Sequence, residues 1–154
     1  MRALRPLLAL AALTVAGTTL APQAKADEAE ALACVRARTW EQYEAGWQIR
    51  TQRGYTLPAS AARRQVRLNL YPGNTYLFQA CGDAAAGRVT LGLFREGAEP
   101  DAAGKVSPVA FDAPAGREPT FEFSPEGAGI YILLLQADDL SGDEAGLALS
   151  VSAR

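Results

Sequence analysis

Most of this 154-residue chain consists of short runs in which apolar and polar residues alternate, separated by segments rich in glycine and proline. An alternation with a period of two places the apolar side chains on one face of a half-buried β-strand. The clearest runs are 66–70, 76–80, 89–93 and 147–151. We therefore expect a mainly β protein, an antiparallel β-sandwich or jelly roll of about eight strands with one N-terminal α-helix.

The remaining strands are expected at 47–52, 106–111, 121–123 and 130–135. Pro108 interrupts the second of these, and because proline cannot donate to a sheet ladder we place that strand at an edge. Segment 54–62 contains Pro58 and small residues and is predicted to be a loop. The run 130–135 is apolar without alternation, which is typical of a strand covered on both faces.

One helix is expected before the strands, because 27–45 contains no proline or glycine. Acidic residues at its start suit a helix N-terminus, and Gly46 is predicted to end it. Cys34 points away from the predicted buried face, so either two sides of the helix are held or the helix begins after Cys34. That face consists of residues at spacings of three and four, namely Leu32, Val35, Thr39, Trp40 and Tyr43.

The first 26 residues have the pattern of an export signal. Arg2 and Arg5 precede an apolar run, and Ala24-Lys25-Ala26 has the small-x-small form that signal peptidase cuts. We expect cleavage between Ala26 and Asp27, giving a periplasmic or secreted protein with no membrane span. The alternative is a retained anchor, although glycine, threonine and proline break the run short of the roughly 20 apolar residues that a span needs.

These patterns divide the chain into a signal peptide (1–26), a helix packed on the sandwich (27–45) and one β-sandwich domain (46–154). Removing 1–26 leaves 12 basic and 17 acidic residues. This balance argues against nucleic acid as a partner, because nucleic-acid binding needs a basic face. The arginines gather before residue 96 and the carboxylates after it, which describes either a dipolar soluble surface or a charged docking face.

The chain has two cysteines, Cys34 and Cys81. In an oxidising compartment an isolated even pair is most simply one disulfide, and here it would tie the helix to the sheet. A redox-active pair would lie close in sequence, as in Cys-x-x-Cys. Lipid attachment at Cys34 is a third interpretation, but acidic residues at 27, 28 and 30 occupy the stretch that a lipoprotein signal keeps hydrophobic.

No common catalytic arrangement is complete in this sequence. The chain has no histidine, which removes Ser-His-Asp and Cys-His sites and the usual zinc ligand sets. Paired carboxylates remain formally open, and Glu118, Glu122 and Glu126 come nearest to such a pair. Glu122 alternates with two phenylalanines and is better explained as the solvent face of a strand. We expect no enzymatic activity and no cofactor.

Three segments are candidates for ligand binding. The first is the acidic segment 138–144. Several carboxylates around a glycine suit calcium, but one local segment supplies too few oxygens, so weak calcium binding or an ordinary solvated loop is expected there. Trp40, Tyr43, Trp47 and Tyr55 form either a sugar- or peptide-binding platform or, as we favour, core packing, with Tyr55 the most exposed. The loop 97–104, with Glu99 and Asp101, and the edge near Pro108 are candidate binding surfaces. The acidic residues of the first segment are Asp138, Asp139, Asp143 and Glu144.

Segment 70–136 also carries a familiar order of turns and strands. It contains Tyr71-Pro72-Gly73-Asn74-Thr75-Tyr76-Leu77-Phe78, then Leu91-Gly92-Leu93-Phe94, then Gly129-Ile130-Tyr131. This order resembles the bacterial pre-peptidase C-terminal type of β-sandwich. The resemblance implies a non-catalytic accessory of secreted proteins, linked to substrate or matrix binding. The acidic residues often found beside the leucine-x-leucine strand are replaced here by Arg88, Thr90 and Gly92.

Together these patterns predict a secreted or periplasmic, non-catalytic β-sandwich that binds an envelope or extracellular protein or glycan. One alternative is an inhibitor of an exported enzyme, which would insert a rigid loop such as 97–104 into a cleft. Another is a calcium- or carbohydrate-dependent adhesion module.

Overall fold

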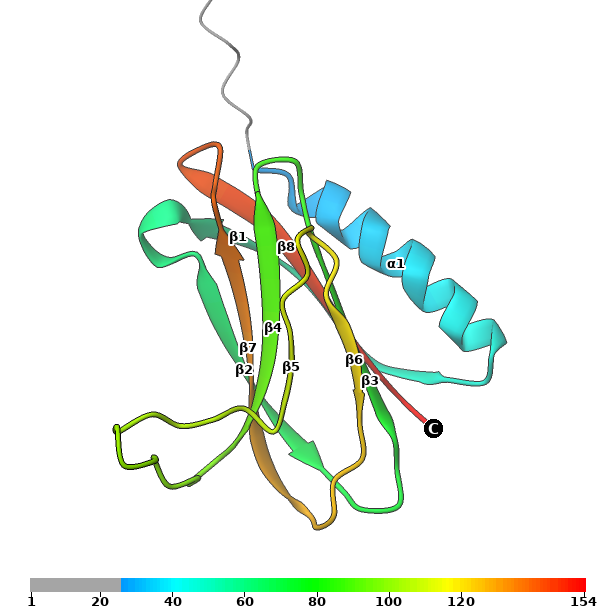
Figure 1. Ribbon diagram of the computed structural model, residues 1–154. Helices are drawn as coiled ribbons and strands as arrows, with labels where there is room; N and C mark the ends of the chain where they lie inside the picture. The colour runs from blue at the N-terminus through cyan, green and yellow to red at the C-terminus, as the bar shows by residue number, and fades with distance from the viewer. Residues whose placement is uncertain (1–25) are drawn as a thin grey trace, which may run out of the picture.

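The computed structural model describes residues 26–154, which form one helix and eight strands (Figure 1). A 3-10 turn at Ala59–Ala61 joins the first two strands. In chain order the elements are α1 (Glu28–Glu44), β1 (Gln48–Pro58), β2 (Arg63–Leu70), β3 (Tyr76–Gly82), β4 (Arg88–Arg95), β5 (Ala110–Asp112), β6 (Thr120–Phe123), β7 (Gly129–Asp138) and β8 (Glu144–Ala153).

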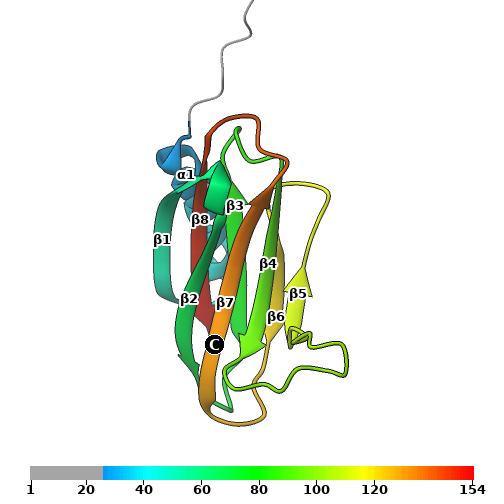
Figure 2. The same ribbon diagram turned by 90° about the vertical axis from the view of Figure 1, so that its left-hand side faces the viewer.

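The strands form two antiparallel sheets of four strands each, packed face to face. The first sheet has the order β1-β8-β3-β6, and the second has the order β2-β7-β4-β5. In Figure 1 the helix lies beside the first sheet, and in Figure 2 the second sheet faces the viewer with no element in front of β2, β7 and β4. The mainly β sandwich with one N-terminal helix, expected from the alternating runs, is confirmed.

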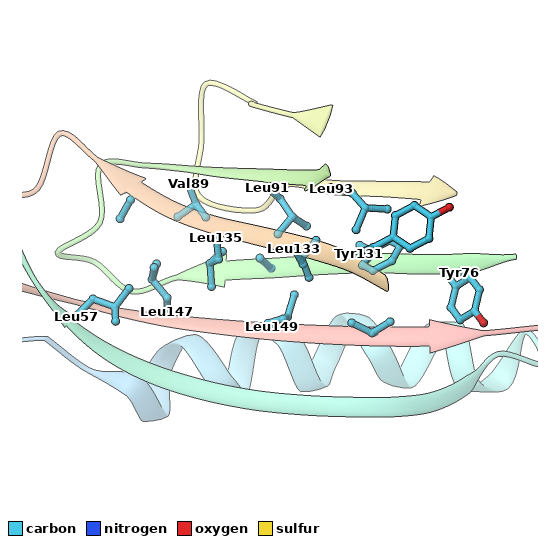
Figure 3. Packing of buried hydrophobic residues seen from close by; sticks show 14 of the residues in the cluster. Leu57, Tyr76, Val89, Leu91, Leu93, Tyr131, Leu133, Leu135, Leu147 and Leu149 are labelled. Atoms are coloured by element: carbon cyan, nitrogen blue, oxygen red, sulfur yellow. The ribbon is translucent and has the colours of Figure 1, made fainter. Parts of the chain in front are cut away.

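The core lies between the sheets and is built from the inward residues of the alternating runs (Figure 3). On the second sheet, Leu91 pairs with Leu135 and Leu93 pairs with Leu133 across β4 and β7. Leu147 and Leu149 of β8 face them from the first sheet. Because strand side chains alternate between faces, each run delivers every second residue to this layer.

The helix packs on the outer face of the first sheet, over β8, β1 and β3. Ala31 and Val35 are fully buried there, together with Cys81 and Ala148. As a result, all of β3 and all but the first residue of β8 are buried. The strands covered on both faces are therefore β3 and β8. The expectation that 130–135 is covered on both faces is wrong within the described chain, because the outward residues of β7 are only half-buried.

Both ends of α1 have local stop signals. The Asp27 carboxylate accepts hydrogen bonds from the backbone N–H groups of Ala29 (2.9 Å) and Glu30 (3.1 Å) and so caps the N-terminus. After Ala45 the chain turns at Gly46, whose φ of 91° lies in the left-handed region that favours glycine. The helix begins before Cys34.

Two strand boundaries differ from the expectation. β1 continues through Gly54 to Pro58, where a loop was predicted, because as an edge strand paired only with β8 it tolerates a proline and small residues. The strand expected at 106–111 is reduced to Ala110–Asp112, and it lies at the edge of the second sheet as predicted.

A disulfide joins Cys34 of α1 to Cys81 of β3, as the lone cysteine pair predicted. Within residues 26–154 no helix is long and apolar enough to cross a membrane.

Candidate functional site

The outer face of the second sheet carries an apolar strip that no other element of residues 26–154 covers (Figure 2). Four of its side chains are half-buried, whereas Phe111 of β5 is 56% exposed. β7 contributes the central row, and the register places Phe94 beside Ile132 and Phe111 beside Gly92. We call this surface the open face. Its members are Phe94, Phe111, Ile130, Ile132 and Leu134.

Gly92 shapes the middle of the open face. A Cβ atom at this position would lie 3.2 Å from the Phe94 ring and 3.4 Å from the Phe111 ring. The missing side chain therefore allows both rings to lie over the sheet surface. In the sequence, Gly92 is noticeable only as part of the leucine-x-leucine strand and as a replacement for an acidic residue, and neither feature predicts this role.

Arginines border the open face. Arg63 and Arg67 lie on the outward side of β2, and Arg88 lies at the start of β4. Arg67 pairs with Glu96 at 2.8 Å, and Arg88 lies 3.8 Å from Asp138 and 3.9 Å from Asp139. The surface therefore combines an apolar centre with a charged rim.

The loop 97–104 follows β4 and projects from the end of the sandwich near β5 (Figure 1). The Asp101 carboxylate accepts hydrogen bonds from the backbone N–H groups of Ala103 and Lys105, both at 2.9 Å. Two backbone bonds, from Gly104 to Asp101 and from Asp101 to Lys105, close the turn. Asp101 therefore organises the loop, whereas Glu99 is exposed. Both residues remain candidates for contact with a partner.

The four aromatic residues near the helix end differ in how far they are exposed to solvent. Trp47 is buried at 2% exposure, as predicted, and the Arg154 guanidinium lies 4.2 Å from its ring centroid. Trp40 and Tyr43 are 61% and 55% exposed, so the prediction that they pack in the core is wrong. Their rings stack on each other at 5.8 Å on the solvent side of α1. Tyr55 is half-buried beneath Arg64 and packs against the core, so the expectation that it is the most exposed of the four is wrong.

The buried face of α1 differs from the predicted one. Ala31, Val35 and Thr39 are its buried residues. Since Thr39 donates to the Val35 carbonyl and accepts from Gln52, a polar residue can occupy the interface. The spacing pattern included the correct residues Val35 and Thr39, but it also admitted the two large aromatics Trp40 and Tyr43, which are more than half exposed.

A groove of about 490 Å³ lies between the helix and the outer side of β3 and β6. Its walls include Arg38 and Glu41 from α1, Gln79 from β3 and Glu122 from β6. Arg38 donates to the Ala80 carbonyl at 3.0 Å and lies 4.0 Å from Glu118. Glu122 is paired with Arg154 at 3.4 Å.

The three glutamates weighed as catalytic carboxylates do not form one cluster. Glu118 and Glu122 are exposed and each pairs with an arginine near the groove. Glu126 lines a separate hollow, beside Arg95, Val109 and Phe123. The three glutamates therefore do not line one common cleft.

The acidic segment 138–144 comprises the end of β7, the connection 139–143 and the start of β8. Asp138 accepts a hydrogen bond from the Gln136 amide at 2.8 Å and, with Asp139, faces Arg88. Asp143 and Glu144 are exposed. Over residues 26–154 no three side chains among Cys, Asp, Glu and His are arranged to hold a metal ion.

We expect that 1 mM calcium leaves the melting temperature unchanged. Arg88 already lies close to the Asp138 and Asp139 carboxylates, and the segment offers few oxygen ligands for calcium. A site with a micromolar dissociation constant would instead add about 4 kcal/mol at that concentration. Thermal unfolding with and without calcium measures the difference. A clear upward shift that disappears in Asp139→Ala and Asp143→Ala would contradict the expectation and would favour the calcium-dependent adhesion module.

The predicted cleavage site lies where the described chain begins. Ala26 is half-buried, and Asp27 caps α1. The proposed leader up to residue 25 is outside the described residues.

No protein-family model matches the chain, and no curated protein matches its sequence. Among solved structures, the fold is similar to Aeromonas hydrophila PliG, a periplasmic lysozyme inhibitor of g-type lysozyme, with 16% identity and a TM-score of 0.49 over 71% of this chain and 90% of that chain. It is also similar to the pre-peptidase C-terminal domain of collagenase from Bacillus anthracis, with 18% identity and a TM-score of 0.46 over 66% of this chain and 87% of that chain. PirA gives 13% identity and a TM-score of 0.38 over 66% of this chain and 92% of that chain.

The pre-peptidase C-terminal resemblance seen in the sequence thus has a counterpart among the structural neighbours. At these identities and TM-scores the likeness concerns the fold alone. The function has to be argued from the residues of this chain.

Proposed function

We propose that this chain is an exported, non-catalytic β-sandwich that binds a protein partner in the periplasm or outside the cell through the open face. One observation carries the proposal. The helix covers the outer face of the first sheet, whereas no element of residues 26–154 covers the outer face of the second sheet, although its central strand is apolar on both sides.

A sheet that faces water on one side normally alternates apolar and polar residues. β7 departs from this pattern, because Ile130, Ile132 and Leu134 lie outward between the inward residues Tyr131, Leu133 and Leu135. Contiguous apolar surface on a soluble protein marks interaction sites. A partner that covers the open face gives β7 the two-sided burial that its sequence is suited to.

The chemistry of the surface favours a protein over other partners. The chain as a whole has 17 acidic against 15 basic residues, which disfavours nucleic acid. An apolar centre with a polar rim is the usual arrangement of a protein–protein interface. The bordering arginines suit a partner with carboxylates around an apolar patch.

Export is supported by two features. Residues 1–26 have the signal-peptide pattern, and the Cys34–Cys81 disulfide suits an oxidising compartment.

A second candidate function is inhibition of an exported enzyme. The observation in its favour is the loop 97–104, which projects from the sandwich and is braced by Asp101. Preorganised loops bind with a smaller loss of conformational entropy, which suits insertion into a cleft. In this case the tip of the loop, including Glu99, would carry the affinity.

Site-specific crosslinking tests the proposal. A photoreactive phenylalanine analogue replaces Phe111 on the open face, and in a control chain it replaces Tyr43 on the helix. The two positions are matched, since both are aromatic and 56% and 55% exposed. We expect an adduct of defined mass at position 111 in the envelope or medium fraction, and none at position 43.

The mass of the adduct distinguishes the occupants. An adduct of twice the chain mass would identify a second copy of this protein instead of a partner. Absence of any adduct at position 111, with an adduct at position 99 in a third chain, would contradict the open face and favour the inhibitor loop.

A further inference from the structure

The carboxylate of Asp83, directly after β3, is fully buried at 0% exposure. Its Oδ1 accepts hydrogen bonds from the backbone N–H groups of Ala85 and Ala86, both at 3.0 Å. Its Oδ2 accepts from the N–H of Asp27 at 2.6 Å and from the N–H of Gly146 at 2.8 Å. Among residues 26–154 no lysine or arginine pairs with it. A buried charge without a cation is costly, which makes the role of this group informative.

One of these four donors is the nitrogen that cleavage after Ala26 would release. We propose that Asp83 is the receptor for the new N-terminus, so that signal-peptide removal creates an ion pair between the Asp27 α-ammonium and the Asp83 carboxylate. This inference rests on the proposed cleavage site and not on the proposed partner.

The chemistry of the step is a hydrolysis by signal peptidase. The bond between the Ala26 carbonyl carbon and the Asp27 nitrogen breaks, the hydroxyl of water goes to the carbonyl carbon, and a proton goes to the nitrogen. The released amine takes up a further proton at neutral pH, because an α-amino group is largely protonated there. A neutral N–H donor thus becomes a cation already in contact with a buried carboxylate.

The site is built from three separate parts of the chain. Asp83 follows β3, Gly146 belongs to β8, and Asp27 precedes α1. Asp83 also donates its own backbone N–H to the Gly146 carbonyl at 2.9 Å. A side chain at Gly146 would overlap the backbone of Asp27 and the Asp83 carboxylate, so glycine is needed for this close approach. The contacts that surround the Asp27 nitrogen therefore come from distant parts of the described chain.

A competing effect must be overcome. A positive charge at the start of a helix opposes the helix dipole. The Asp27 side chain and Glu30, which pairs with Arg117 at 3.8 Å, partly offset this charge. The Asp83 carboxylate contacts the Asp27 nitrogen directly, at 2.6 Å, and a hydrogen bond between two ionised groups is roughly twice as strong as a neutral one. The ion pair therefore outweighs the unfavourable dipole.

The test uses the full chain with Lys105→Arg, exported and processed by the cell. Lys25 leaves with the leader, so in this protein the α-amine is the only primary amine. N-terminal sequencing should begin at Asp27. Half of the sample is unfolded, acetylated and refolded with its disulfide intact, which converts the ammonium back to a neutral amide like the one in the uncleaved chain. We expect acetylation to lower the melting temperature by about 5 °C.

Asp83→Asn provides the matched control, because in that chain acetylation should no longer lower the melting temperature. If this variant does not fold, the acetylation rate of the native Lys105→Arg protein replaces it. We expect that rate to be at least about tenfold lower than in the unfolded protein, since the amine is held by Asp83. A first residue other than Asp27, an unchanged melting temperature on acetylation, or equal acetylation rates would each overturn the proposal.

Discussion

Replacing both Cys34 and Cys81 with alanine should lower the free energy of unfolding by about 4 kcal/mol, because the disulfide closes a loop of roughly 48 residues in the unfolded chain. A loss of that size corresponds to a fall in melting temperature of roughly 10–20 °C for a chain of this length. Alanine is used because Cys81 is fully buried and a serine hydroxyl would add an unpaired polar group there. Chemical denaturation monitored by circular dichroism measures the change.

Removing the disulfide should disturb the structure only around α1. The cysteines belong to the small cluster between α1 and the first sheet, and not to the core between the sheets. We therefore expect hydrogen exchange to show lost protection in α1, while β4 and β7 stay protected. Single and double variants should lose equal stability, since either one opens the loop. Unchanged stability in all three, or loss of the sandwich itself, would contradict this account.

Replacing Leu133 with alanine should destabilise the protein by about 2–5 kcal/mol, the range for deleting a fully buried leucine. Leu133 is 0% exposed, lies opposite Leu93 and Val66 across its two neighbouring strands, and faces the core of the sandwich. The cavity would open in the middle of the core, where β7 and β4 cannot collapse without breaking their ladder. Urea denaturation of the purified variant measures the loss.

Leu134→Ala is the matched control, one residue along the same strand. Its side chain lies on the open face and is only half-buried, so we expect a loss below about 1 kcal/mol. The same variant should reduce crosslinking from position 111, because it removes part of the proposed contact surface. If Leu134→Ala cost as much as Leu133→Ala, the outer face would be covered within the chain itself and the proposed docking surface would be wrong.

Several features of this protein follow from the sequence by local rules. Alternation in 66–70, 76–80 and 89–93 identifies strands because successive side chains must point to opposite faces. The edge position of β5 follows from Pro108, which cannot donate to a ladder. The disulfide follows from an isolated cysteine pair beside an export signal. Each of these predictions depends on properties of a few neighbouring residues, and each is confirmed except for the strand ends.

Other features depend on which elements meet in space, and no local pattern contains that information. The helical spacing that includes Val35 also includes Trp40 and Tyr43, and only the packing of α1 on β8 decides that those two rings are exposed to solvent. The apolar run of β7 indicated two-sided burial, but the helix covers β8 and β3 instead, since small residues such as Ala148 allow its close approach. No local pattern distinguishes Asp83 from the other carboxylates, and only the fold places it against the Asp27 nitrogen, 56 residues away. The sequence alone determined which segments are strands and helix, because those depend on period and turn chemistry. Only the tertiary structure decided which faces stay open and which charges meet, because these depend on contacts between distant parts of the chain.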